Sequence, residues 1–107
     1  MIATRKMGAC VELKMAGGKL VYHTKPGGVT EIVDIEVAEA SRRKGIGGQL
    51  VKAVASCVGE HSVIHVFTRR TNGIARLFYQ SLGMFEVVIP GFYPNEDACL
   101  FVNKERP

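Results

Sequence analysis

The chain has 107 residues, of which 47% are hydrophobic and 22% charged; these values are typical of a soluble globular protein and exclude a disordered one. One domain over residues 1–107 is expected, without a secretory signal or a membrane helix, because no charge-free stretch approaches the required ~20 residues. The net charge of +4 favours an anionic partner, which could be a nucleic acid, an acidic protein or a phosphorylated cofactor.

The first third of the chain predicts antiparallel hairpins. Residues 10–15 alternate weakly between apolar and polar side chains, a turn follows at residues 16–18, and residues 19–24 form a second strand. After a turn at residues 25–28, residues 30–38 (TEIVDIEVA) are β-branched and apolar apart from three carboxylates. This composition predicts a largely buried strand.

The remaining elements alternate between helix and strand. Residues 46–59 follow helical spacing, residues 62–68 form a strand, and residues 75–82 form a short amphipathic helix. Thr71 or Asn72 could cap the second helix, and Gly83 could end it. Two final strands are expected at residues 84–89 and 97–102, around a loop at residues 90–95.

This order of elements predicts the fold class. The strand–helix–strand crossover implies a parallel strand pair, and the hairpins imply antiparallel pairs. We therefore expect a mixed, mainly antiparallel α/β (α+β) sheet with one parallel strand pair and two helices.

The chain has three cysteines, Cys10, Cys57 and Cys99. A disulfide framework would need a larger, even number. Reduced thiols in a cytoplasmic protein fit better. No compact set of metal ligands occurs, and no cysteine lies in a basic turn that would lower its pKa. We expect neither a metal nor a cysteine nucleophile.

Residues 37–51 (VAEASRRKGIGGQLV) carry the most informative pattern. A strand ends, a basic glycine-rich turn follows, and a helix begins. The first amides of a helix lack partners and the helix dipole is positive there, so a phosphate can bind where glycines admit it to the backbone. This predicts a pyrophosphate site; the alternative is a flexible turn with solvated basic side chains. The dinucleotide fingerprint fails, because Leu50 stands where its third glycine belongs, and the P-loop has no match.

Two segments resemble the GNAT superfamily of acyltransferases, which bind acetyl-coenzyme A (acetyl-CoA). Residues 42–47 (RRKGIG) are similar to its R/Q-x-x-G-x-G/A signature, and residues 72–84 (NGIARLFYQSLGM) to its N-x-x-A-x-x-F/L-Y-x-x-x-G-F/M motif. Both occur in the expected order, and the resemblance covers roughly residues 29–103. The family's usual N-terminal helices, which wall the acceptor site, are not expected here, so the chain resembles a short member truncated at its N-terminus.

The resemblance implies a cofactor site on the strand end, the basic turn and the second helix. The family's oxyanion amide follows a strand bulge, which here would lie at or beside Val37. Asn72 matches the asparagine that reaches the pantetheine arm; its alternative role is a plain helix cap. The implied cofactor-binding residues are Ile35, Glu36, Val37, Arg42, Arg43, Lys44, Gly45, Ile46, Gly47, Gly48, Asn72, Ala75, Phe78 and Tyr79.

Acyl transfer to an amine needs a base, an oxyanion site and an acid for the leaving thiolate. The resemblance assigns the acid to Tyr79, whose alternative role is core packing. For the base, Glu31 ranks before Glu36 and Asp34, since the histone acetyltransferase branch has its glutamate six residues before the position of Val37. By strict alternation, Asp34 and Glu36 share one face of the strand and Glu31 the other. Each carboxylate could instead form a structural ion pair.

Residues 91–98 (GFYPNEDA) resemble a loop of the branch that acetylates protein N-termini, where Tyr93 would lie near the acceptor amine; the alternative is an ordinary hairpin loop.

Our first hypothesis is an acetyl-CoA-dependent N-acetyltransferase acting on a primary amine by direct attack in a ternary complex. The alternatives are a non-catalytic CoA-binding regulatory module and a small nucleic-acid binder. Nucleic acid is not favoured, because no row of aromatic residues accompanies the basic clusters 42–44 and 69–70, which coenzyme A phosphates would explain. A homodimer is possible, with the second subunit completing the acceptor site.

Overall fold

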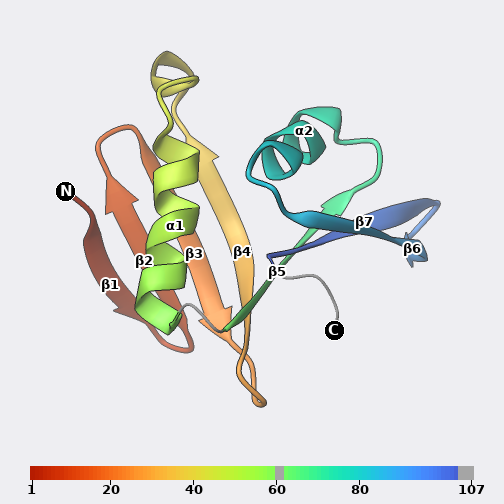
Figure 1. Ribbon diagram of the computed structural model, residues 1–107, viewed down its shortest axis with the longest axis horizontal. Helices are drawn as coiled ribbons and strands as arrows, with labels where there is room; N and C mark the ends of the chain where they lie inside the picture. Colours follow the sequence, from red (N-terminus) through yellow and green to blue (C-terminus); the bar gives the residue numbers. More distant parts are fainter. Residues whose placement is uncertain (60–61, 104–107) are drawn as a thin grey trace. The chain divides into compact units, whose positions relative to one another are not determined.

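The computed structural model describes residues 1–59 and 62–103, which belong to two compact units, Met1–Ser62 and Val63–Pro107 (Figure 1). The first unit is an antiparallel sheet whose strands are paired in chain order. A short 3-10 helix, Glu39–Ser41, leads from this sheet to helix α1, Ile46–Val58, which contacts β2, β3 and β4. The strands are β1 (Ala3–Met7), β2 (Cys10–Met15), β3 (Gly18–Thr24) and β4 (Val29–Val37).

Helix α1 covers one face of this sheet because its apolar residues recur at helical spacing. Ile46, Leu50 and Val54 are buried. The buried side chains of the strands are Leu13, Leu20, Tyr22, Thr30 and Ile32. Glycine makes the close approach possible: a Cβ on Gly18 would lie 2.7 Å from Cγ2 of Ile46. The turn between β2 and β3 therefore fixes where α1 begins.

The strand β1 is a correction to the sequence analysis, which assigned no element to residues 3–7. Its sequence, ATRKM, has no apolar alternation, and its first four residues are exposed. Pairing with β2 stabilises it instead, across a turn in which Gly8 has φ +62°. An end strand held by backbone hydrogen bonds leaves no hydrophobic pattern to detect.

The second unit contains strands β5 (Val63–Arg69), β7 (Glu96–Val102) and β6 (Phe85–Tyr93), paired antiparallel in that spatial order. Helix α2, Gly73–Ser81, packs the ring of Tyr79 against Phe101, with 5.3 Å between the ring centroids. Asn72 caps the helix, and Gly83 with φ +77° follows its end, as expected.

The strand β6 is longer than predicted. Residues 90–93 were expected in a loop, but the strand continues through them to Tyr93, and only Pro94 and Asn95 form the turn. Pro90 is tolerated because β6 pairs on one side only within this unit, and the register shift between Ile89 and Tyr93 marks a bulge.

The fold class predicted from the sequence is confirmed as a mainly antiparallel α/β protein with two helices. The parallel pair would join strands of different units and stays a prediction, as does the single domain over residues 1–107. None of the helices in the described residues is long and apolar enough to span a membrane.

Candidate functional site

The basic turn before α1 has the backbone expected of an anion site. Arg42, Arg43 and Lys44 are exposed, and none lies within 4.0 Å of a carboxylate in the described residues. Gly45, at the N-cap of α1, has φ +75°, a left-handed conformation that favours glycine. No side chain caps the helix, and its first turn contains no acidic residue. Neither the cap nor the first turn of α1 therefore supplies an anion to the positive end of its dipole.

The first amides of α1 have no hydrogen-bond partner in the described part of the chain. Gln49 donates its backbone N–H to the Gly45 carbonyl at 3.0 Å. The N–H groups of the preceding residues, Ile46 to Gly48, make no hydrogen bond among residues 1–59 and 62–103. A Cβ placed on Gly45 would meet no heavy atom within 4 Å, so the space beside the turn is open. Cationic side chains, unpaired amides and open space together fit a diphosphate group.

The three candidate carboxylates of β4 share one face of the sheet, which corrects the strict alternation expected from the sequence. The register between β3 and β4 shifts at Val33, where one extra residue forms a bulge. After the bulge, the residues of β4 that strict alternation would place on one face of the sheet lie on the other face. Lys19, Val21 and His23 alternate regularly on one face of β3, and their direct partners are Glu36, Asp34 and Glu31.

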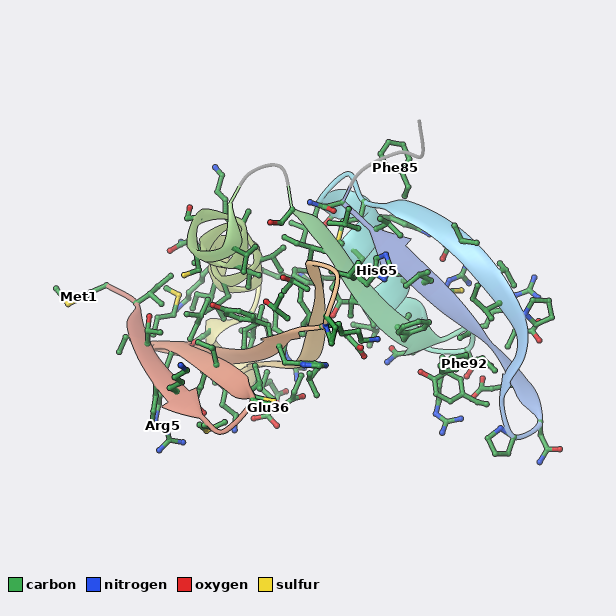
Figure 2. All side chains as sticks on the ribbon, turned by 90° about the horizontal axis from the view of Figure 1, so that it is seen from below. Met1, Arg5, Glu36, His65, Phe85 and Phe92 are labelled. Atoms are coloured by element: carbon green, nitrogen blue, oxygen red, sulfur yellow. The ribbon has the colours of Figure 1, made fainter. Side chains whose placement is uncertain are left out.

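That face lies opposite α1, and Figure 2 shows Arg5 and Glu36 projecting from it. The strand is therefore half-exposed, not largely buried as predicted: only Thr30 and Ile32 are buried. The burial cost expected for carboxylates in a central strand is therefore avoided at Asp34 and Glu36, which are exposed, while Glu31 is half-buried beside Lys25.

The carboxylates differ in their partners. Glu31 forms an ion pair with Lys25 at 2.7 Å, and Glu36 forms one with Lys19 at 3.5 Å. Within the described part of the chain, Asp34 has no cation within 4.0 Å. The structural ion pair that the sequence left open for each carboxylate therefore occurs at Glu31 and Glu36.

The backbone of Val37 turns its N–H away from β3. The next amide, that of Ala38, donates to the Gly17 carbonyl at 2.8 Å, and successive amides of a strand point in opposite directions. The bulge of β4 lies at Val33, four residues before Val37, at or beside which the family resemblance places the oxyanion amide. The direction of the Val37 amide does not depend on that bulge.

Helix α2 carries the second set of candidate residues. The Asn72 side chain accepts a hydrogen bond from the Ala75 backbone N–H at 3.1 Å, so its capping role is confirmed. Tyr79 is buried, with 4% of its surface exposed, and Phe78 packs edge-on against it at 5.0 Å between ring centroids. Ala75, Phe78 and Tyr79 follow i, i+3, i+4 spacing and share one side of the helix.

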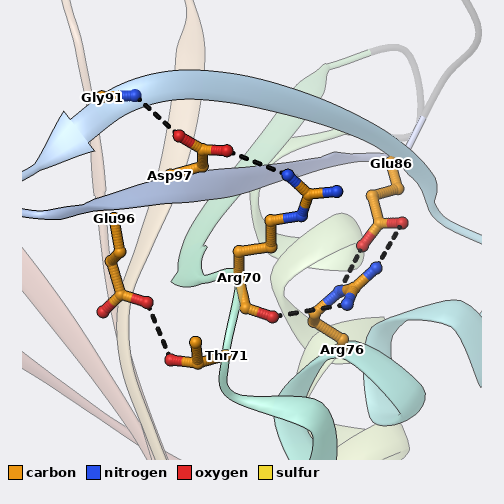
Figure 3. Close-up of polar contacts among 7 residues, drawn as sticks. All are labelled: Arg70, Thr71, Arg76, Glu86, Gly91, Glu96 and Asp97. Carbon is orange, nitrogen blue, oxygen red and sulfur yellow. Dashed lines mark hydrogen bonds and ion pairs between the residues drawn. The ribbon is translucent and has the colours of Figure 1, made fainter.

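The turn from β5 into α2 is held by ion pairs (Figure 3). Glu96 accepts hydrogen bonds from Arg69 and from the Thr71 hydroxyl, each at 2.7 Å. Asp97 accepts from Arg70 and from the Gly91 backbone N–H, each at 2.9 Å. Arg69 and Arg70 are therefore engaged by carboxylates, in contrast to the basic turn 42–44, and the sequence reasoning that gave both clusters to coenzyme A phosphates missed this.

A further ion pair, between Arg76 and Glu86, joins α2 to β6. Arg76 donates to both carboxylate oxygens of Glu86, at 2.8 and 3.2 Å. Hydrogen bonds from Arg76 hold the pKa of Glu86 below its usual value. Hydrogen bonds from Arg69 and Thr71 lower the pKa of Glu96, and those from Gly91 and Arg70 lower that of Asp97. No local pattern in the sequence links these positions.

The aromatic tip of the β6–β7 hairpin folds back onto β5. Phe92 stacks on Phe67 with 4.8 Å between centroids, and the Arg69 guanidinium lies 4.4 Å from the centre of the Tyr93 ring.

Burial raises the pKa of the Cys99 thiol, and its neighbour Glu86 raises it further. Residues 1–59 and 62–103 contain no cluster of side chains able to hold a metal ion.

Comparison with known proteins gives the family. The model of the acetyltransferase (GNAT) family matches residues 9–84. No curated protein matches the chain. Among solved structures, a GNAT-family acetyltransferase from Elizabethkingia anophelis with acetyl-CoA bound is similar at a TM-score of 0.76 and 20% identity. The match covers 98% of this chain and 97% of that one.

Longer structures match as well. A GNAT-family protein from Desulfovibrio desulfuricans has a TM-score of 0.74 and 22% identity over 87% of this chain, which spans 65% of its length. The ribosomal-protein-S18-alanine N-acetyltransferase from Escherichia coli has a TM-score of 0.69 and 18% identity, covering 95% of this chain and 74% of that one. At these identities the likeness concerns the fold.

Proposed function

Because the chain belongs to the GNAT family of acetyltransferases, we propose that it is an acetyl-CoA-dependent N-acetyltransferase. It transfers an acetyl group to a primary amine, on a small molecule, a protein N-terminus or a lysine, by direct attack in a ternary complex. The observation that carries the proposal is the basic turn before α1, where Arg42, Arg43 and Lys44 flank unpaired helix amides.

The proposed cofactor contacts follow the elements described above. The amides of residues 43–48 hold the pyrophosphate, and Asn72 reaches the pantetheine arm with the amide nitrogen that capping does not use. Ile35, Glu36, Ala75 and Phe78 complete the binding residues. The Elizabethkingia structure supports the proposal, because a chain matched over nearly its whole length has acetyl-CoA bound.

Acetyl-CoA supplies an activated acetyl thioester. The residues of this chain bind, polarise and move protons. The Val37 N–H, which points away from β3, donates to the carbonyl oxygen as negative charge develops on it. A carboxylate takes one proton from the attacking amine, and the Tyr79 hydroxyl gives one to the leaving sulfur as the C–S bond breaks and the C–N bond forms.

The structure favours Asp34 as the carboxylate that takes this proton. The carboxylates of Glu31 and Glu36 are already engaged in ion pairs with Lys25 and Lys19. Asp34 has no such partner in the described residues. Glu31 and Glu36 stay candidates behind it, in the order that the sequence suggested.

Binding tests the proposal. Isothermal titration with acetyl-CoA should give one site per chain, and replacing Arg42, Arg43 and Lys44 together by glutamine should weaken binding by about tenfold or more at low salt. Lys14→Gln, which removes an exposed lysine of β2, is the matched control and should leave the affinity unchanged. Equal affinities of wild type and triple variant would remove the basic turn from the cofactor site. Binding without turnover against any amine would favour the regulatory module.

We also propose that the protein is a cytoplasmic homodimer. The outer strands β1 and β6 each pair with a single strand within their unit, and β6 exposes Phe85, Val87 and Val88. Exposed strand edges and apolar side chains favour association. Static light scattering should give twice the chain mass of 11.7 kDa, and a mass equal to one chain would contradict the dimer.

A further inference from the structure

The turn that leads from β5 into α2 is restrained far more than its exposure would suggest. Arg69, Arg70, Thr71 and Asn72 are all exposed. Three of these four consecutive side chains nevertheless hydrogen-bond to two consecutive carboxylates, Glu96 and Asp97, and the fourth caps α2. We call this set of contacts the Glu96–Asp97 clamp.

Each carboxylate oxygen of the clamp has its own donor. Glu96 accepts from Arg69 on one oxygen and from Thr71 on the other, and Asp97 divides its oxygens between Arg70 and the Gly91 backbone. The backbone adds a further bond, because Arg70 donates its N–H to the Asp97 carbonyl at 3.0 Å. The start of β7 is thus connected to every residue of the turn before Asn72.

The far side of the turn is fixed by α2 itself. Arg76 donates to the Arg70 carbonyl at 3.3 Å while its other nitrogens pair with Glu86. The backbone of Asn72 donates to the Arg69 carbonyl at 2.9 Å. A rotation of the first turn of α2 would break several of these contacts at once.

Ion pairs in which the arginine is exposed make only a modest contribution to folding stability, so stability alone does not explain why these pairs are concentrated at one turn. Resting on the proposed function, we propose that Glu96 and Asp97 are positioning residues, which hold the turn 69–72 so that Asn72 and α2 meet acetyl-CoA in one orientation. They act through Thr71 and the arginines and do not touch the cofactor. Preorganised binding groups lose less free energy to ordering when the ligand arrives.

The test separates orientation from folding. Isothermal titration reports the dissociation constant Kd and the fraction of competent chains independently, and is run well below the unfolding temperature of every variant. Glu96→Gln and the milder Thr71→Val should each raise the Kd for acetyl-CoA on the order of tenfold, as loss of a supporting contact does at other sites. The double variant should bind no more weakly than Glu96→Gln alone, since the contact that Thr71→Val removes is one of the two contacts that Glu96→Gln already disturbs.

Glu12→Gln is the matched control, because it removes an ion pair with Arg5 in the other unit, and it should leave Kd unchanged. A purely structural clamp would lower the unfolding temperature and the competent fraction but not change Kd, and that result with Thr71→Val would overturn the inference. If Glu96→Gln does not fold, Thr71→Val decides alone. Absence of binding by the wild-type chain would instead overturn the proposed function on which the clamp depends.

Discussion

Asn72 has two roles that its atoms can separate. Its side-chain oxygen caps α2 through the Ala75 amide, and its amide nitrogen is the proposed contact to the cofactor. Asn72→Ala should destabilise the fold by ~1 kcal/mol, the usual cost of a lost cap, and should also weaken acetyl-CoA binding. Asn72→Ser should keep the cap and the stability but lose affinity. Thermal unfolding and titration of both variants check this; full affinity in Asn72→Ser would leave Asn72 as a cap only.

Tyr79 is the clearest test of the proposed chemistry at the level of one atom. Its ring packs against Phe78 and Phe101, and Tyr79→Phe keeps that packing while removing the hydroxyl. Since a general acid acts in the transition state, kcat should fall by ~10²-fold with little change in the affinity for acetyl-CoA. Steady-state kinetics beside titration measures both, and an unchanged kcat would reduce Tyr79 to packing.

At the scale of elements, the acidic residues of the second unit predict a pH-dependent stability. The pKa values of Glu86, Glu96 and Asp97 are lowered in the folded state by their hydrogen-bond donors. These three carboxylates therefore add to the free energy of unfolding in full above their unfolded-state pKa of roughly 4. That contribution is lost as the pH falls through their lower folded-state pKa values.

Replacing Glu86 by glutamine should accordingly destabilise the protein at neutral pH and have less effect in acid. Denaturant unfolding between neutral and acidic pH measures this: the gap in free energy of unfolding between wild type and Glu86→Gln should narrow as the pH falls. Glu39→Gln, at an exposed carboxylate outside the ion pairs described, should show no such narrowing. If the difference in free energy of unfolding between wild type and Glu86→Gln stayed constant with pH, an ionic contribution of Glu86 to stability would be excluded.

The strand β4 shows where sequence reasoning stops at this scale. Its β-branched composition identified the strand, and helical spacing identified α1 and α2 to within a few residues. The bulge at Val33 could not be predicted, because it depends on the register against β3 and no local residue signals it. That single extra residue decides which carboxylates share a face.

At the scale of the whole molecule, the sequence predicted the components that local patterns encode. The basic turn, the helix cap and the two family motifs all depend on neighbouring residues, and each was found. The ion pairs that join Arg69, Arg70 and Arg76 to β6 and β7 were not found, because their partners lie 10 to 27 residues away. Ion pairs between residues far apart in the sequence can be predicted only when the fold is known.

The central claim is that this chain transfers an acetyl group from acetyl-CoA to an amine. The most direct measurement is thiol release from acetyl-CoA by the purified protein across a panel of small amines, lysine peptides and peptides with free N-termini. We expect amine-dependent release, an acetylated product detected by mass spectrometry, and strong loss of both in Tyr79→Phe. Tight binding of acetyl-CoA with no amine-dependent release from any member of the panel would contradict it.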